Sequence, residues 1–177
     1  MRQILSMVWA EVVAVASSLG LFGVFITSLI GSASIIFPIP AFALVITAGT
    51  VFNPVVVGVV AGLGSAIGEL TGYGVGYGIR RAKHRLRKEN KLERKLEKEE
   101  KKWDKTFRGY FHRKLGFVLI VLFAVTPLPD DIIGVFCGLV HYDVKRFFVA
   151  TLIGKTVQGI VLAYIGLLGT GLFFSLF

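Results

Sequence analysis

The sequence predicts an all-helical polytopic membrane protein, and three observations carry this prediction. Hydrophobic residues make up 54% of the chain and 21 of its 177 residues are glycine, which is more apolar and richer in glycine than an ordinary soluble domain. The charges are concentrated in residues 79–114, which hold 16 of the 20 Lys and Arg residues. Paired prolines interrupt two of the apolar stretches. This composition excludes a disordered chain, a disulfide scaffold and most soluble enzymes, and we expect residues 1–177 to form a single membrane domain.

The first half of the chain, residues 1–79, is expected to hold two full spans with a re-entrant hairpin between them. Residues 1–11 fit an interfacial lead-in with Trp9 at the headgroup level. They fit a cleaved signal peptide less well, since Glu11 would fall near the end of its apolar region. A span of about residues 12–30 follows. Pro38 and Pro40 then break the apolar stretch 31–51 into pieces too short to cross a bilayer of about 30 Å.

The second full span, residues 55–79, carries a stripe of small residues on one helical face. Gly64, Gly68, Gly72 and Gly76 recur every four residues, and the stripe also holds residues spaced by three or four: Gly58, Gly62, Ser65, Glu69, Gly72 and Gly76. Such spacing lets another helix approach closely. We expect the stripe to pack against the final span around Gly154 and Gly159, or alternatively to form a homodimer contact. Glu69 lies on the same stripe, and a carboxylate at this depth should face protein or water.

Residues 80–114 are expected to form a soluble, basic, helical excursion. Their apolar residues recur at helical spacing among Lys and Glu: Leu92, Leu96, Trp103, Phe107 and Tyr110 or Phe111. The positive-inside rule places this excursion in the cytoplasm, at the plasma membrane if the chain is prokaryotic. Its first basic residues predict binding of anionic lipid headgroups: Arg80, Arg81, Lys83 and Arg85. The alternative is a solvated helix with one face on the membrane. The excess of positive charge is confined to this segment, so we do not expect a nucleic-acid partner.

The second half, residues 115–177, repeats the order of the first. Two apolar arms, 115–125 and 132–140, flank the interruption Thr126-Pro127-Leu128-Pro129-Asp130-Asp131, and a last span covers about residues 147–168. Pro127 and Pro129 follow Pro38 and Pro40 by 89 residues. Because the second hairpin would enter from the opposite side, we expect an inverted repeat with three full spans and two oppositely oriented re-entrant hairpins.

These segments resemble the DedA/VTT superfamily, also called SNARE-associated Golgi proteins, over roughly residues 20–168. The resemblance is carried by four motifs: Phe37-Pro-Ile-Pro40 with Ala48-Gly49, Gly64-Ser-Ala-Ile-Gly-Glu69-Leu-Thr-Gly72-Tyr73-Gly-Val-Gly76, Thr126-Pro-Leu-Pro129-Asp-Asp131, and Phe147 through Gly154-Lys155. It implies a lipid translocator, a flippase or scramblase of phospholipids or polyprenyl-phosphate carriers. Bacterial members carry an acidic residue after the first prolines and two arginines around the second hairpin's proline. This chain has Ala41 and Phe42 at the first place, and Ala124 and Asp130 at the second.

The ionisable residues expected at membrane depth are the candidate substrate and coupling site. They are Glu69, Asp130, Asp131 and Lys155, and Thr126 stands beside the two aspartates in the sequence. Intramembrane charge is costly and usually functional, so a carboxyl here could exchange a proton during transport while Lys155 acts as counter-ion or headgroup ligand. Alternatively, Lys155 only ties the two halves together, and one aspartate caps the outgoing arm.

Other classes of function are less well supported. No histidine or arginine falls inside a predicted span, which argues against a lipid-phosphate phosphatase, and we expect no enzyme activity. His84, His112 and His141 show no metal-ligand spacing, so neither a metal nor another cofactor is expected. An ion or small-solute transporter of the same architecture remains an alternative, as does a scaffold that acts through the basic excursion.

Overall fold

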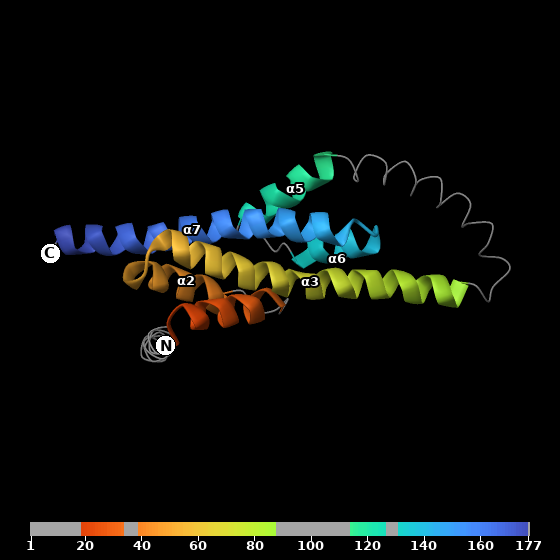
Figure 1. The fold of residues 1–177 in the computed structure, drawn as a ribbon, viewed down its shortest axis with the longest axis horizontal. Helices are drawn as coiled ribbons and strands as arrows, with labels where there is room; N and C mark the ends of the chain where they lie inside the picture. Colours follow the sequence, from red (N-terminus) through yellow and green to blue (C-terminus); the bar gives the residue numbers. More distant parts are fainter. Residues whose placement is uncertain (1–18, 34–38, 88–113, 127–130, 177) are drawn as a thin grey trace.

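The computed structural model describes residues 19–33, 39–87, 114–126 and 131–176, and in this part of the chain all regular structure is helical (Figure 1). Six helices are present among these residues: Leu19–Ala33, α2 (Ile39–Val51), α3 (Pro54–Arg87), α5 (Lys114–Val125), α6 (Asp131–Leu139) and α7 (Val144–Leu176). The predicted all-helical class is therefore confirmed. Pro38, Pro127, Pro129 and Asp130 lie outside the described residues.

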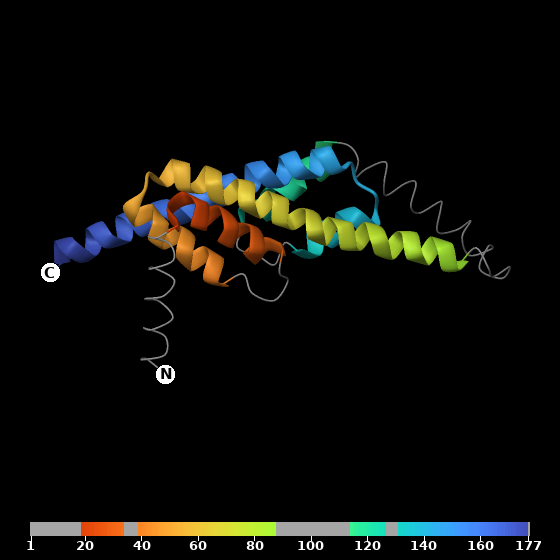
Figure 2. The ribbon, with the colours of Figure 1, turned by 60° about the horizontal axis from the view of Figure 1, so that its bottom comes forward.

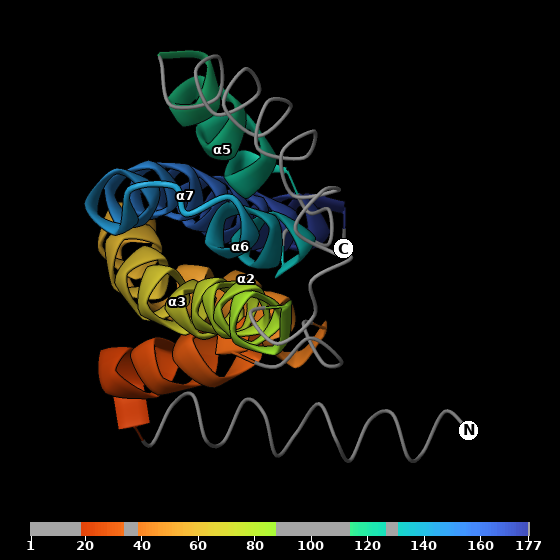
Figure 3. The same cartoon turned by 90° about the vertical axis from the view of Figure 1, so that its right-hand side faces the viewer.

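Two of these helices are long and apolar enough to cross a membrane, over Pro54–Ala82 in α3 and Val144–Gly169 in α7. They run antiparallel along the long axis of the molecule, and each extends beyond the rest at its C-terminal end (Figures 1 and 2). Seen along that axis, α3 and α7 lie in the middle, with Leu19–Ala33 outside α3 and α5 outside α7 (Figure 3). Many apolar side chains on α3, α5 and α7 are exposed, as expected for helices that face lipid.

The predicted segment boundaries hold in part. The first helix does not stop at Ile30 but continues to Ala33, because Gly31 does not adopt the positive φ with which a glycine ends a helix. Residues 12–18 lie outside the described part. At its end Gly31 approaches Ala41 of α2, so these two short helices lie side by side. The other predicted hairpin arms correspond to α5 and α6. Pro40 lies in the first turn of α2, where a missing N–H is tolerated. Re-entry of residues 31–51 and 115–140 into a membrane stays a prediction, as does a full span over about residues 12–30.

The two long helices begin at equivalent places with the same capping chemistry. The Asn53 side-chain oxygen accepts a hydrogen bond from the Val55 N–H at 3.0 Å, and Pro54 occupies the first helical position of α3, which suits proline. The Asp143 carboxylate accepts a hydrogen bond from the Arg146 N–H at 2.8 Å. Both side chains satisfy N–H groups that the helix leaves unpaired.

The halves also make reciprocal contacts. Several glycines of one half lie so close to the backbone of the other half that a Cβ would clash. The glycine at the equivalent position of the other half makes the corresponding contact with the first half. The pairs are Gly49 on Ala163 with Gly138 on Tyr73, and Gly76 on Val135 with Gly166 on Ile46. Thus α2 packs on α7 as α6 packs on α3. Such reciprocity is what two halves related by a pseudo-two-fold axis produce.

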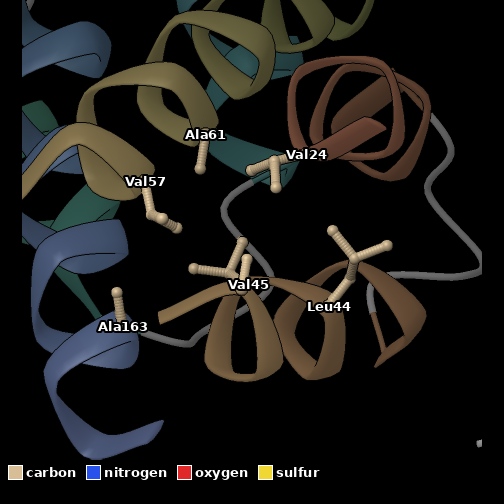
Figure 4. Packing of buried hydrophobic residues seen from close by; sticks show 7 residues of the cluster. Val24, Leu44, Val45, Val57, Ala61 and Ala163 are labelled. Carbon is tan, nitrogen blue, oxygen red and sulfur yellow. The ribbon is translucent and has the colours of Figure 1, made fainter. Parts of the chain in front are cut away.

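Two clusters of buried, mostly apolar residues fill the space between the helices. One cluster joins the first helix, α2, α3 and α7 (Figure 4): Val24, Leu44, Val45, Ala48, Val57, Ala61 and Ala163. A second cluster joins α5, α6 and α7: Ile120, Cys137, Val140, Tyr142, Phe147 and Ala150. Between helices in lipid, close packing of this kind replaces the hydrophobic effect as the source of stability.

The glycine stripe of α3 meets α7 only in part. Gly64 and Gly68 lie against the first helix, and Gly76 lies against α6. A four-residue step turns the stripe by about 40° around an α-helix, so the row passes from one neighbour to the next. The contact with α7 uses Gly58, which meets Gly159, and Gly62, which meets Thr156. Gly72 is buried, and Gly154 lies against α5.

Candidate functional site

Glu69 and Lys155 form an ion pair between the two membrane-length helices. The Lys155 Nζ lies 3.3 Å from the Glu69 Oε1, and the two side chains are 6% and 3% exposed. Each residue lies near the middle of its apolar segment, Pro54–Ala82 or Val144–Gly169. A charge at this depth is strongly disfavoured without a partner. Each residue therefore supplies the opposite charge that the other needs, and the pair joins the two halves.

A glycine on α6 makes room for the Glu69 carboxylate. A Cβ placed on Gly134 would lie 3.4 Å from the Glu69 Oε2 and equally close to the Glu69 backbone carbonyl. Glu69 therefore lies where α3, α6 and α7 meet. A Cβ at this distance would be in ordinary van der Waals contact, so alanine would also fit at position 134, whereas a longer side chain there could press on the carboxylate.

The α7 side of the site is a row of buried polar residues. Thr151, Lys155 and Gln158 are spaced by four and three residues, so they share one face of α7, and each is at most 6% exposed. The sequence reasoning missed Thr151 and Gln158. Polar residues at helical spacing inside an apolar span could have indicated a buried polar face. Uncharged side chains such as these are only a weak indication of a functional site.

Gln158 connects this row to the end of α5. Its side-chain nitrogen donates a hydrogen bond to the backbone carbonyl of Thr126 at 2.9 Å. The Thr126 hydroxyl donates to the Phe123 carbonyl at 2.8 Å, so it bonds its own helix locally. Thr126 thus reaches the site through its carbonyl, one helical turn along α7 from Lys155.

Two further polar groups lie buried in the described part of the molecule. The Ser28 and Thr151 hydroxyl oxygens have no hydrogen-bond partner among the described residues. Asp131 is the first residue of α6, and Asp130 lies outside the described residues. The structure therefore brings together Glu69 and Lys155, links Thr126 to them through Gln158, and leaves the part of the aspartates a prediction.

The predicted headgroup residues fall on the last turns of α3. Arg80 donates a hydrogen bond to the carbonyl of Leu139, the last residue of α6, at 2.6 Å. Arg81 and Arg85 are exposed, and the side chain of Lys83 lies outside the described part. Arg80 therefore has a protein contact that the sequence did not predict, a cation at a helix C-terminus, where it is favourable. Headgroup binding stays a prediction for all four.

Arg80 belongs to a row on α3 that holds the turn between α6 and α7. The Tyr73 hydroxyl donates to the Tyr142 carbonyl at 2.6 Å, and the Tyr77 ring stacks on His141 with 4.7 Å between centroids. His141 has a φ of +54°, and the Tyr142 N–H donates a hydrogen bond to the Cys137 carbonyl at 2.9 Å. This is a Schellman motif that ends α6, with His141 at the position that glycine normally occupies. Stacking on Tyr77 offsets part of that backbone strain.

The chemistry available at the site is binding and proton exchange. Among the described residues no group of three or more His, Cys, Asp or Glu side chains could hold a metal ion. The site offers an ammonium, a carboxylate and an amide, all buried among apolar helices. An ammonium can hold a phosphate or carboxylate group, and a carboxylate can take up a proton or hold a cation.

Comparison with protein families finds a match to the VTT domain over residues 39–168. This is the domain of the DedA/SNARE-associated Golgi proteins, and the match spans α2 to most of α7. Neither the comparison with curated proteins nor that with solved structures found a match.

Proposed function

We propose that this chain, which belongs to the VTT domain family of membrane proteins, moves lipids across a bilayer. The observation that carries the proposal is the buried Glu69–Lys155 pair at the middle of the two membrane-length helices. Intramembrane charge marks pathways for substrates and protons more often than it serves stability. We infer transport and not catalysis, because binding and proton exchange are the chemistry that these side chains offer.

The reciprocal contacts support an inverted-repeat mechanism. In transporters of this kind the substrate site lies near the bilayer midplane, at the interface of the two repeats, where helices are interrupted. Glu69 comes from the first half and Lys155 from the second, and α5 ends within a helical turn of Lys155. We propose that the two pairs of short helices are re-entrant hairpins and that a lipid headgroup passes between the halves at this level.

Charge balance at the ion pair suggests how a substrate would be coupled to protons. A lipid phosphate that binds Lys155 displaces Glu69 from its ammonium partner. The carboxylate would then be buried and unpaired, a state that costs several kcal/mol. Uptake of a proton by Glu69 removes this cost, so we propose that binding of a phospholipid or a polyprenyl phosphate is coupled to protonation of Glu69.

The exposed end of α3 fits a contact with anionic lipids. Arg81 and Arg85 are exposed, Arg81 at the end of the apolar segment Pro54–Ala82 and Arg85 beyond it. We propose that they hold this end at the cytoplasmic headgroups, following the positive-inside rule. For a homodimer, α3 offers Gly74 and Gly78, which are exposed with open space beside them. Two such helices could approach closely there.

Lipid movement in proteoliposomes tests the proposal. Labelled phospholipid and polyprenyl-phosphate reporters are followed with wild type, Glu69→Gln and Lys155→Ala, and Ile67→Leu on the exposed face of α3 serves as the matched control. We expect wild type and control to move at least one reporter and both site variants to lose that movement. The pH profile of any residual activity in Glu69→Gln should be flat, and a profile like that of wild type would remove Glu69 from proton coupling.

The same experiment separates the alternative classes. If folded, inserted wild type moves no lipid, the lipid proposal fails. Uptake of ions or small solutes would then support a secondary transporter. A scaffold would instead lose its cellular effect when residues 84–110 are deleted, with no transport by any variant.

A further inference from the structure

We propose that Gln158 is a positioning residue that fixes the end of α5 beside the Glu69–Lys155 pair. This inference rests on the proposed function for its consequence in transport, but the geometry can be tested without it. Gln158 is 6% exposed and donates from its side-chain nitrogen to the Thr126 carbonyl at 2.9 Å. No role was expected for it from the sequence.

The end of α5 needs such a partner. The last carbonyls of a helix accept no hydrogen bond from an N–H of the same helix, and in an apolar environment an unsatisfied carbonyl is costly. At this end of α5 the Thr126 N–H and hydroxyl both donate to the Phe123 carbonyl, at 3.1 and 2.8 Å. The Thr126 carbonyl lies beyond them and is satisfied by Gln158 of another helix.

The spacing on α7 ties this contact to the ion pair. Lys155 and Gln158 are three residues apart, about 4.5 Å along the helix axis, and they lie on the same face. One residue therefore holds α3 and the other holds α5. A shift of α7 that separates Lys155 from Glu69 would also pull on the end of α5, so ligand exchange at the pair and the position of α5 are mechanically joined.

Side-chain chemistry makes the role testable with two substitutions of similar size. In Gln158→Leu no donor remains at any pH. In Gln158→Glu an ionised carboxylate cannot donate, whereas the protonated acid donates one O–H to the Thr126 carbonyl. Gln158→Glu should therefore regain the contact as the pH falls, and Gln158→Leu should not. Val157→Leu, an exposed position on the neighbouring face of α7, is the matched control.

The first readout is the distance between α5 and α7. Spin labels at Leu119→Cys and Val161→Cys, both exposed positions, are introduced with Cys137→Ala and measured in proteoliposomes. We expect Gln158→Leu to broaden the distance distribution at every pH, and Gln158→Glu to broaden it only at neutral and alkaline pH. An unchanged distribution in Gln158→Leu would overturn the positioning role.

The second readout is lipid movement in the same vesicles. We expect Gln158→Leu to be slower than wild type by roughly tenfold, the rate change equivalent to about 1.4 kcal/mol, and Gln158→Glu to recover at acid pH. Recovery of Gln158→Leu with acid would contradict the role of the donor. If wild type moves no lipid but the label distances follow the predicted pattern, the proposed function fails and the positioning role stands.

Discussion

Removing the two charges of the buried pair singly and together should show that they act as one unit. At the 3.3 Å separation of Lys155 Nζ and Glu69 Oε1, their attraction is about 5 kcal/mol for an effective dielectric constant of 20. Much of this is spent on the desolvation of both groups. Breaking a buried pair by removing one partner costs about 3–5 kcal/mol, whereas replacing both with neutral residues of similar size is often close to neutral.

We therefore expect Glu69→Gln and Lys155→Met each to lower the free energy of unfolding by about 3–5 kcal/mol. The double variant should lose much less than their sum, with a coupling energy of about 3 kcal/mol. Unfolding would be followed by steric trapping in bicelles. Arg81→Met, which removes an exposed charge, is the control and should change stability little. A double variant that loses as much as the two single variants combined would refute the pairing.

Three further predictions concern packing and turns. Gly68→Leu, against the first helix, should lower the free energy of unfolding by about 1–3 kcal/mol, whereas Gly74→Leu, facing open space, should leave it unchanged; equal loss in a thermal melt would contradict the helix contacts. Arg80→Met should cost about 1.5–3 kcal/mol by freeing the carbonyl at the end of α6, and the matched Arg81→Met variant should cost nothing comparable. Asp143→Ala should cost about 1 kcal/mol through the lost cap of α7; chemical denaturation in detergent would check this, and Asp143→Ser should recover most of the loss.

The helical architecture could be predicted because apolar length and proline placement depend on local sequence. The spans in α3 and α7 and the short arms in α5 and α6 follow from runs of apolar residues and their interruptions. The span was expected over residues 55–79, with a helical excursion from residue 80. In the structure one helix, α3, crosses this boundary and continues to Arg87, because charged residues end a membrane span without ending a helix.

The candidate site could be predicted only where it carries charge. Glu69 and Lys155 stand out because charge is rare at membrane depth, and the sequence suggested that Lys155 could tie the halves together. Gln158 and Thr151 are uncharged, so a single sequence gives little reason to select them. Tyr77 and Arg80 are residue types that are common at a membrane interface. The sequence therefore gave no reason to expect their contacts with the end of α6 and the α6–α7 turn.

Which helices pack against each other could be predicted from the sequence only in part. The glycine stripe on α3 was recognised, and its contact with Gly159 of α7 was expected. Its contacts with the first helix and α6 were not, since a four-residue repeat drifts around the helix and crosses from one neighbour to the next. Which element fills each side depends on the tertiary arrangement. The reciprocal glycine contacts between halves likewise follow from the repeat at an offset of 89 or 90 residues, but only three-dimensional structure shows that they cross between halves.

Lipid translocation by the Glu69→Gln/Lys155→Met double variant tests the central claim most directly. If the ion pair lies on the transport path, this variant should insert and fold with near wild-type stability yet move neither phospholipid nor polyprenyl-phosphate reporters in proteoliposomes, while Ile67→Leu moves them at the wild-type rate. Wild-type movement by the folded double variant would show that the pair holds the halves together without taking part in transport, and would contradict the account.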